Sequence, residues 1–147
     1  MFPLKEGDIM TYNQIKSKLL SSLGSISEGQ VYLKTTAIPT SYPSATYQYR
    51  GFEPSEKMDS RGCKGYLKFS LFILEDVTDY AKQGDIWEPG NEADSMETIL
   101  KEKLDNLAKV IMADRMIFEG YDTYPGQSDG GRDLLIGRLD LKARGAI

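Results

Sequence analysis

Three short segments gather acidic side chains that could hold a metal ion or transfer protons. They read "DVTDY" at 76–80, "GDIWEPGNEAD" at 84–94 and "EGYD" at 119–122. An EF-hand calcium loop needs oxygen ligands at alternate positions and a closing glutamate, and these segments lack that spacing. Carboxylate pairs for acid–base catalysis need a buried cleft, and nothing in the sequence places two acids in one. We therefore interpret these acids as solvated loop residues and predict no metal or other cofactor.

The other elements of catalytic chemistry are equally sparse. The glycine-containing segment "GYDTYPGQSDGG" at 120–131 fits neither a P-loop nor a G-x-G-x-x-G turn after a strand. The chain has no histidine, which removes the commonest general base and metal ligand. Its one cysteine, Cys63, excludes an internal disulfide, and we expect it to be a small buried hydrophobe. The sequence therefore predicts a protein without enzymatic activity.

Composition indicates one soluble globular domain, spanning residues 1–147. The chain is 40% hydrophobic and 27% charged, with a net charge of -4. An acidic chain lacks the basic footprint of a protein that binds duplex nucleic acid. No segment approaches the roughly 20 apolar residues of a membrane span, and the N-terminus lacks the apolar core of a signal peptide. We expect the protein to be made in a reducing cytoplasm and to have no membrane partner.

Two amphipathic helices are predicted. The first begins at the capping box formed by Thr11 and Gln14 and stops at Gly24. The second begins near Asp94, which has capping-box spacing to Glu97, although Ser95 is an alternative cap. Each helix has one apolar stripe, made by Ile15, Leu19, Leu20 and Leu23 in the first and by Met96, Leu100, Leu104, Leu107 and Ile111 in the second.

Alternating apolar and polar residues predict strands at 30–38, 45–50, 63–76 and 133–144. A polar loop is expected at 53–62, a connection at 76–92 and a flexible tip at 125–131. Met116 to Phe118 reads as a short strand or the tail of the helix. Together these elements predict an α+β fold, with a mainly antiparallel sheet of about four strands and both helices packed on one face.

The stretch "YPSATYQYRGFEP" at 42–54 raises the question of a binding site. Tyr47 and Tyr49 share one side of the predicted strand, where tyrosine rings cover a pleated surface well. We interpret this face as scaffold. If it is exposed, it becomes a candidate subunit interface. Arg50 and Glu53 flank the strand end and are expected to be solvated.

Three pieces of the chain carry a resemblance to a known family. They are the N-terminal helix leading to "YPSATYQYRG", the long strand "GYLKFSLFILEDV", and the long helix followed by a polar loop and "DLLIGRLDLKARGAI". In these patterns, from about residue 11 to 144, the chain resembles the tail terminator (tail completion) proteins of tailed bacteriophages. The motifs are patterns of elements, and the loop 53–62 and the Trp87 connection fall where such proteins vary.

The resemblance implies a structural virion protein without catalysis. Such proteins assemble as a ring, usually a hexamer, that caps the tail tube and meets the head-side neck or connector, and DNA passes through the lumen. The implied location is the head–tail junction of the virion, after assembly in the host cytoplasm. Two alternatives stay open: a neck or head-completion protein of the same particle, and a small-molecule binding module with an apolar pocket.

A ring needs a heterologous interface, in which two different patches of the subunit meet. We expect the exposed tyrosine face and the polar loops to supply these contacts. The candidate interface residues are Tyr47, Tyr49, Arg50, Phe52, Glu53, Lys57, Asp59, Arg61, Trp87, Tyr121 and Tyr124.

Overall fold

A computed structural model describes residues 9–26, 30–32, 42–55, 62–78, 92–128 and 130–146 of the chain. Within these ranges lie two long helices, α1 (Tyr12–Ile26) and α3 (Glu92–Ala113). The strands of the same ranges are β1 (Gln30–Tyr32), β2 (Ser44–Pro54), β3 (Lys64–Asp76), β4 (Ile117–Gln127) and β5 (Asp133–Ala146).

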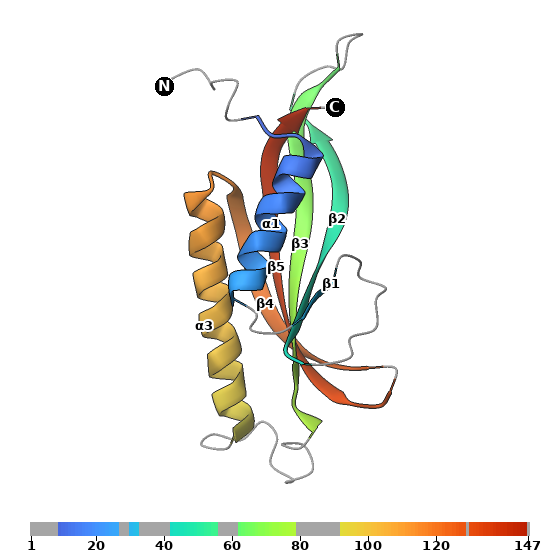
Figure 1. Cartoon of the computed structure of the whole chain (residues 1–147), viewed down its shortest axis with the longest axis vertical. Coiled ribbons are helices and arrows are strands. Elements are labelled where there is room, and N and C mark those ends of the chain that lie inside the picture. Colours follow the sequence, from blue (N-terminus) through green and yellow to red (C-terminus); the bar gives the residue numbers. More distant parts are fainter. Residues whose placement is uncertain are drawn as a thin grey trace.

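The strands form one sheet in the order β1-β2-β3-β5-β4. β3 is central and pairs antiparallel with β2 and β5, and β4 pairs antiparallel with β5. Only β1, which pairs with β2, runs parallel to its neighbour. In Figure 1 the long strands follow the long axis of the molecule, and α1 and α3 run beside them. The predicted α+β fold, mainly antiparallel with two helices, is confirmed.

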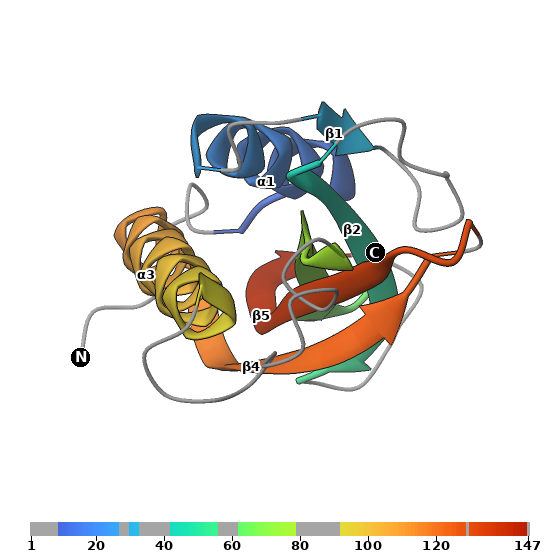
Figure 2. The ribbon, with the colours of Figure 1, turned by 90° about the horizontal axis from the view of Figure 1, so that it is seen from below.

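Both helices pack on one face of the sheet. Alternate residues of β3 and β5 point toward them, and Phe69 at the centre of β3 is fully buried. Residues from both helices join the same apolar cluster, which is why the two helices must lie on the same side of the sheet (Figure 2). Its most buried members are Ile15, Leu19 and Leu23 of α1, Leu71 and Ile73 of β3, Leu100, Leu104, Leu107 and Ile111 of α3, and Leu139 and Leu141 of β5.

Helix α1 begins as the capping box predicts. The Thr11 N–H donates to Gln14 Oε1 at 2.9 Å, and the Gln14 N–H donates to Thr11 Oγ1 at 3.2 Å. Each bond satisfies an N–H group that the start of a helix leaves without a partner. The helix ends at Ile26, so the predicted stop at Gly24 is wrong. A glycine inside a helix costs only about 1 kcal/mol, which the burial of Leu23 and its neighbours outweighs.

Helix α3 is tied to the sheet by two polar contacts as well as by its apolar stripe. Lys103 Nζ lies 2.7 Å from Glu75 Oε1 of β3, and both side chains are largely buried. The Tyr121 hydroxyl of β4 donates to Asp105 Oδ1 at 2.6 Å, and this bond raises the pKa of Tyr121. The helix starts at Glu92, slightly before the predicted cap at Asp94.

Strand β4 is the main difference from the sequence prediction. The predicted short segment at 116–118 and the first part of the predicted tip, residues 125–127, belong to one strand, Ile117–Gln127, which pairs with β5 along its length. The described remainder of the tip forms the turn to β5, where the Gly131 N–H donates to the Ser128 carbonyl oxygen at 2.9 Å. Alternation is interrupted at Gly120, where the register shifts, and at Pro125. Proline has no backbone N–H to donate to a neighbouring strand. Because β4 is at the edge of the sheet and has a neighbour on one side only, the missing donor of Pro125 costs little.

Some predictions change at their boundaries, and others fall outside the described residues. Glu53 and Pro54 pair with β3, so they belong to β2 and not to the predicted loop at 53–62. Cys63 is buried, as expected. The predicted strand residues 33–38, the loop residues 56–61 and the connection residues 79–91 lie outside the described part of the chain.

None of the described helices is long and apolar enough to cross a membrane.

The core assignment can be tested at Phe69. Phe69→Ala should lower the free energy of unfolding by about 3–5 kcal/mol, because it removes a fully buried ring and leaves a cavity. A denaturant titration measures this loss. Ile99→Ala on the exposed side of α3, where Ile99 is 45% exposed, is the control and should cost far less. A loss at Phe69 below about 1 kcal/mol would show that this strand face is not the core.

Two glycines form a matched pair for a second test. A Cβ on Gly137 would lie 2.9 Å from Leu104 Cδ1 and 3.1 Å from Leu100 Cδ1, whereas a Cβ on Gly24 meets nothing within 4 Å. Gly137→Ala should therefore destabilise the protein by about 1–3 kcal/mol through overpacking. Gly24→Ala should stabilise it by about 0.5–1 kcal/mol, since alanine is the better helix former. Thermal and urea unfolding would contradict this packing if both variants shifted stability in the same direction.

Candidate functional site

The face of the sheet turned away from α1 and α3 is the candidate site, and we call it the open face. Neither of the described helices covers it (Figure 2). From β2 to β4 its side chains include Thr46, Gln48, Arg50, Glu53, Tyr66, Lys68, Ser70, Phe72, Leu74, Ile136, Arg138, Asp140, Lys142, Arg144, Ile117, Glu119, Asp122 and Tyr124. Along the strands this face divides into an apolar hollow, a central charged network and a basic end.

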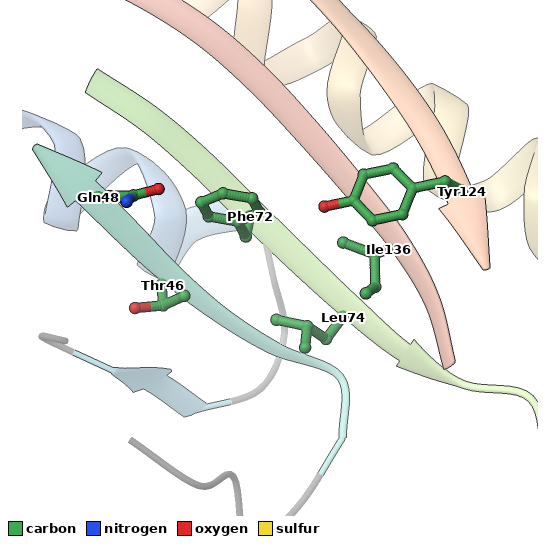
Figure 3. A pocket seen from close by; sticks show the side chains of 6 residues that line it. All are labelled: Thr46, Gln48, Phe72, Leu74, Tyr124 and Ile136. Atoms are coloured by element: carbon green, nitrogen blue, oxygen red, sulfur yellow. The ribbon is translucent and has the colours of Figure 1, made fainter. Parts of the chain in front are cut away.

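The hollow has a volume of about 220 Å³. Phe72 and Leu74 of β3 and Ile136 of β5 form its floor, and Tyr124 of β4 overhangs it with the hydroxyl directed toward Phe72 (Figure 3). Thr46 and Gln48 of β2 complete the lining (Figure 3). Burial raises the pKa of the Tyr124 phenol, although nearby Arg138 opposes that rise. The lining residues carry no formal charge at neutral pH, so the hollow suits an apolar or aromatic group.

Two β-bulges place charged residues at the centre of the open face. The register shifts between Tyr49 and Gly51 in β2 and between Phe118 and Gly120 in β4, which leaves Arg50 and Glu119 as the extra residues. Gly51 has φ 118° and Gly120 has φ 131°, a conformation that L side chains rarely adopt. The glycines therefore permit the bulges that present Arg50 and Glu119.

Arg50 reaches across two strands. Its Nη2 donates to the carbonyl oxygens of Phe69 at 3.2 Å and Leu141 at 3.3 Å, and to Glu119 Oε1 at 3.0 Å. Arg50 thus connects β2 to β4 over the central pair of strands, and its side chain is only 24% exposed. The expectation that Arg50 is solvated at a strand end is wrong. A bulge places the guanidinium over the sheet, where it is held by charge-assisted hydrogen bonds.

Asp140 completes the charged network. Ser70 Oγ donates to Asp140 Oδ1 at 2.6 Å, and Arg138 Nε donates to the same oxygen at 3.0 Å. Arg50 Nε lies 3.9 Å away. Burial alone would raise the pKa of Asp140, but the hydrogen bonds from Ser70 and Arg138 and the two positive charges outweigh it and hold that pKa below its usual value. Asp140 is therefore ionised and held in place at neutral pH.

The basic end lies where β3 begins and β5 ends. Lys142 Nζ lies 4.5 Å from the centre of the Tyr66 ring, and the Arg144 guanidinium carbon lies 5.7 Å from it. Two cations over one aromatic ring are each attracted to its face. Lys68 Nζ lies 3.7 Å from Glu53 Oε2 across the strand pair. This part of the sheet is thus positively charged and structurally ordered.

The predicted interface residues divide between the two faces of the sheet. Arg50, Glu53 and Tyr124 lie on the open face. Phe52 packs against the core, and Tyr121 bonds to α3. Four further candidates lie outside the described residues: Lys57, Asp59, Arg61 and Trp87.

The tyrosine face that raised the question of a binding site turns toward α1. Tyr47 is only 8% exposed and belongs to the core. Tyr49 is 39% exposed, with its ring 5.2 Å from those of both Tyr12 and Phe69. The interpretation of this face as scaffold is confirmed for Tyr47, while Tyr49 stays at the rim.

The central network is the part of the site that sequence reasoning missed. Ser70, Glu119, Arg138 and Asp140 belong to strands that pair far apart in sequence, so their spacing carries no signal. The one local signal is the pair of glycines, Gly51 and Gly120, each directly following a charged residue in a strand. Such a glycine indicates a bulge that redirects the residue before it.

The described side chains form no evident catalytic arrangement. Within the described ranges no group of three or more His, Cys, Asp or Glu residues could hold a metal ion. Three carboxylates of the open face, those of Glu53, Glu119 and Asp140, are engaged by Lys68, Arg50, and Arg138 with Ser70, respectively. This arrangement is suited to binding a complementary surface.

Comparison with known proteins adds no relative. No protein-family model matches the chain, and no curated protein matches it.

The Asp140 network predicts a specific pH dependence. The pKa of Asp140 is lower in the folded chain than in the unfolded chain. Ionised Asp140 therefore stabilises the fold in full at pH values above its pKa in the unfolded chain, and this stabilisation is lost as pH falls through its pKa in the folded chain. Asp140→Asn should therefore be less stable than the native chain at pH 7, with the gap closing below about pH 4. Urea titrations across that range measure the gap. A gap that stays constant with pH would contradict the network.

Proposed function

We propose that the chain is a structural virion protein, a subunit of the ring that caps the tail tube of a tailed bacteriophage and joins it to the head-side neck. In this proposal the ring is a hexamer, its partners are the tube protein, the neck protein and further copies of itself, and DNA passes through its lumen. The protein has no catalytic role. Its place is the head–tail junction of the virion, after assembly in the host cytoplasm.

The observation that carries the proposal is the apolar hollow on the open face. A solvated face of an antiparallel sheet normally carries polar residues, with the apolar ones turned inward. Here Phe72, Leu74 and Ile136 gather on the outward side, next to Tyr124. An apolar centre beside charged groups is the usual composition of a protein–protein interface. This arrangement supports a chain that buries its open face in an assembly.

The size of the hollow favours a protein partner over a small molecule. Sites for small molecules commonly enclose about 300–1,000 Å³ and have a few converging polar groups. The hollow measures about 220 Å³ and lacks a charged lining residue. A small-molecule binding module is therefore the weaker alternative. A neck or head-completion protein would use the same kind of surface, and only its place in the particle distinguishes it.

The acidic charge of the chain is consistent with a DNA conduit. With a net charge of -4, a ring of copies carries a negative charge that repels phosphates. Binding that releases no counterions leaves DNA free to move through the lumen. This argument supports the proposed ring and applies equally to the neck alternative.

A charge placed in the hollow tests the proposal. Phe72→Glu should still fold, because Phe72 lies outside the helix-covered core, but its incorporation into virions should fall at least about tenfold. An unpaired carboxylate buried at an interface costs several kcal/mol. Mass spectrometry of purified virions, with the tube protein as internal reference, measures incorporation.

The control for this experiment is Met112→Glu, which makes the same kind of change at an exposed position of α3 outside the hollow. It should be incorporated at the native level. Circular dichroism of both variants shows whether each is folded. Native incorporation of a folded Phe72→Glu protein would refute the proposed use of the open face.

A further inference from the structure

Charge is segregated along the long axis of the molecule. The basic end contains the described sheet residues beyond the central network, where β3 starts and β5 finishes. Its charged residues are four bases, Lys64, Lys68, Lys142 and Arg144, and one acid, Glu53. Residues 64 to 68 of β3 pair with residues 142 to 146 of β5, so these charges share one small area.

The opposite end is acidic. It comprises the first half of α3, residues 92–103, and the adjoining ends of β3 and β5, which α3 reaches through the Lys103–Glu75 ion pair. In Figure 1 the start of α3 and the arrowhead of β3 lie together, at the opposite end of the long axis from the arrowhead of β5. Among the side chains that the structure describes, five acids face three bases here, namely Glu75, Asp76, Glu97, Glu102 and Asp133 against Lys101, Lys103 and Arg132.

The two ends are too far apart to neutralise each other within one molecule. The 13 residues of β3 separate them, which corresponds to roughly 40 Å of extended strand. The Debye length is only about 10 Å at 0.1 M salt. Each end therefore presents its own charge to the surroundings. Partial pairing at the acidic end, such as Arg132 with Asp76 at 2.6 Å, leaves the exposed side chains of Glu97 and Glu102 available.

We propose that the basic end of one copy docks on the acidic end of the next, so that the protein self-associates head to tail. This inference rests on the proposed ring and identifies the contact between neighbouring subunits. The two surfaces are different, so the contact is heterologous, as a closed ring requires. Charge complementarity supplies its orientation, because two basic ends or two acidic ends repel.

A second copy fits the basic end better than nucleic acid does. The whole chain carries a net charge of -4, so it repels a long polyanion, whose charge cannot be confined to the basic end. A second copy can place its acidic end on the basic end, where the two charges complement each other. Binding to nucleic acid is thus the competing outcome of the test.

Single charge reversals at the two ends give a matched experiment. Lys142→Glu and Lys101→Glu change the net charge equally. The head-to-tail contact predicts that Lys142→Glu weakens self-association at least about fivefold, while Lys101→Glu leaves it unchanged or strengthens it. Sedimentation equilibrium at low salt measures both constants. Repulsion between two acidic chains would instead weaken the self-association of both variants equally, and that result would overturn the proposal.

Salt and rescue variants strengthen the test. Raising salt from 0.1 M to 1 M shortens the Debye length to about 3 Å and should weaken the native association. Glu97→Lys combined with Glu102→Lys should restore association when mixed with Lys142→Glu. If the native protein stays monomeric at low salt and millimolar concentration, or if Lys142→Glu loses only nucleic-acid binding, the proposal fails.

Cross-linking determines the orientation of the contact. Lys142→Cys mixed with Glu97→Cys should give cross-linked dimers with a short bifunctional reagent, and either variant alone should not. Cys63 is buried and offers little background. Dimers from Lys142→Cys alone would show a two-fold contact and overturn the head-to-tail arrangement. The Phe72→Glu incorporation assay is independent of these results, so failure of this contact is distinguishable from failure of the proposed function.

Discussion

Phe69 of β3 and the residues that alternate with it are buried under α1 and α3, and this one-sided packing governs the rest of the structure. Gly137 allows Leu100 and Leu104 of α3 to approach β5 closely, and the Lys103–Glu75 ion pair joins the helix to the end of β3. Because both described helices cover the same face, the opposite face of the long sheet has no described helix over it. The apolar hollow, the charged network and the basic end all lie on that opposite face.

The charged network gives the open face a fixed shape. Arg50 and Glu119 meet across β3 and β5 only because a bulge in each outer strand inserts one extra residue. Asp140 is held by hydrogen bonds from Ser70 and Arg138. A surface whose side chains are already ordered loses less conformational entropy when it docks. This order supports the proposal that the open face binds a complementary protein surface.

The sequence predicted the elements whose hydrophobic period is unbroken. The stripe of α3, the alternation of β3 and β5 and the capping box of α1 all follow from local spacing, and so does the α+β fold. It did not predict β4 as a full strand, because Gly120 and Pro125 interrupt its alternation. It also missed the meeting of Arg50 with Glu119, which are 69 positions apart. Pairing between distant strands leaves no local pattern, so the site could be only partly predicted.

The account depends most on the claim that this chain is a ring subunit at the tail–neck junction, with its open face buried in the assembly. A cryo-electron microscopy reconstruction of that junction, in virions that contain the chain, tests the claim most directly. The account predicts several copies around the tail axis, between tube and neck, with Phe72, Ile136 and Tyr124 covered by a neighbouring protein. Finding the chain on the capsid surface or at the distal tail tip, or finding the hollow open to solvent in the ring, would contradict it.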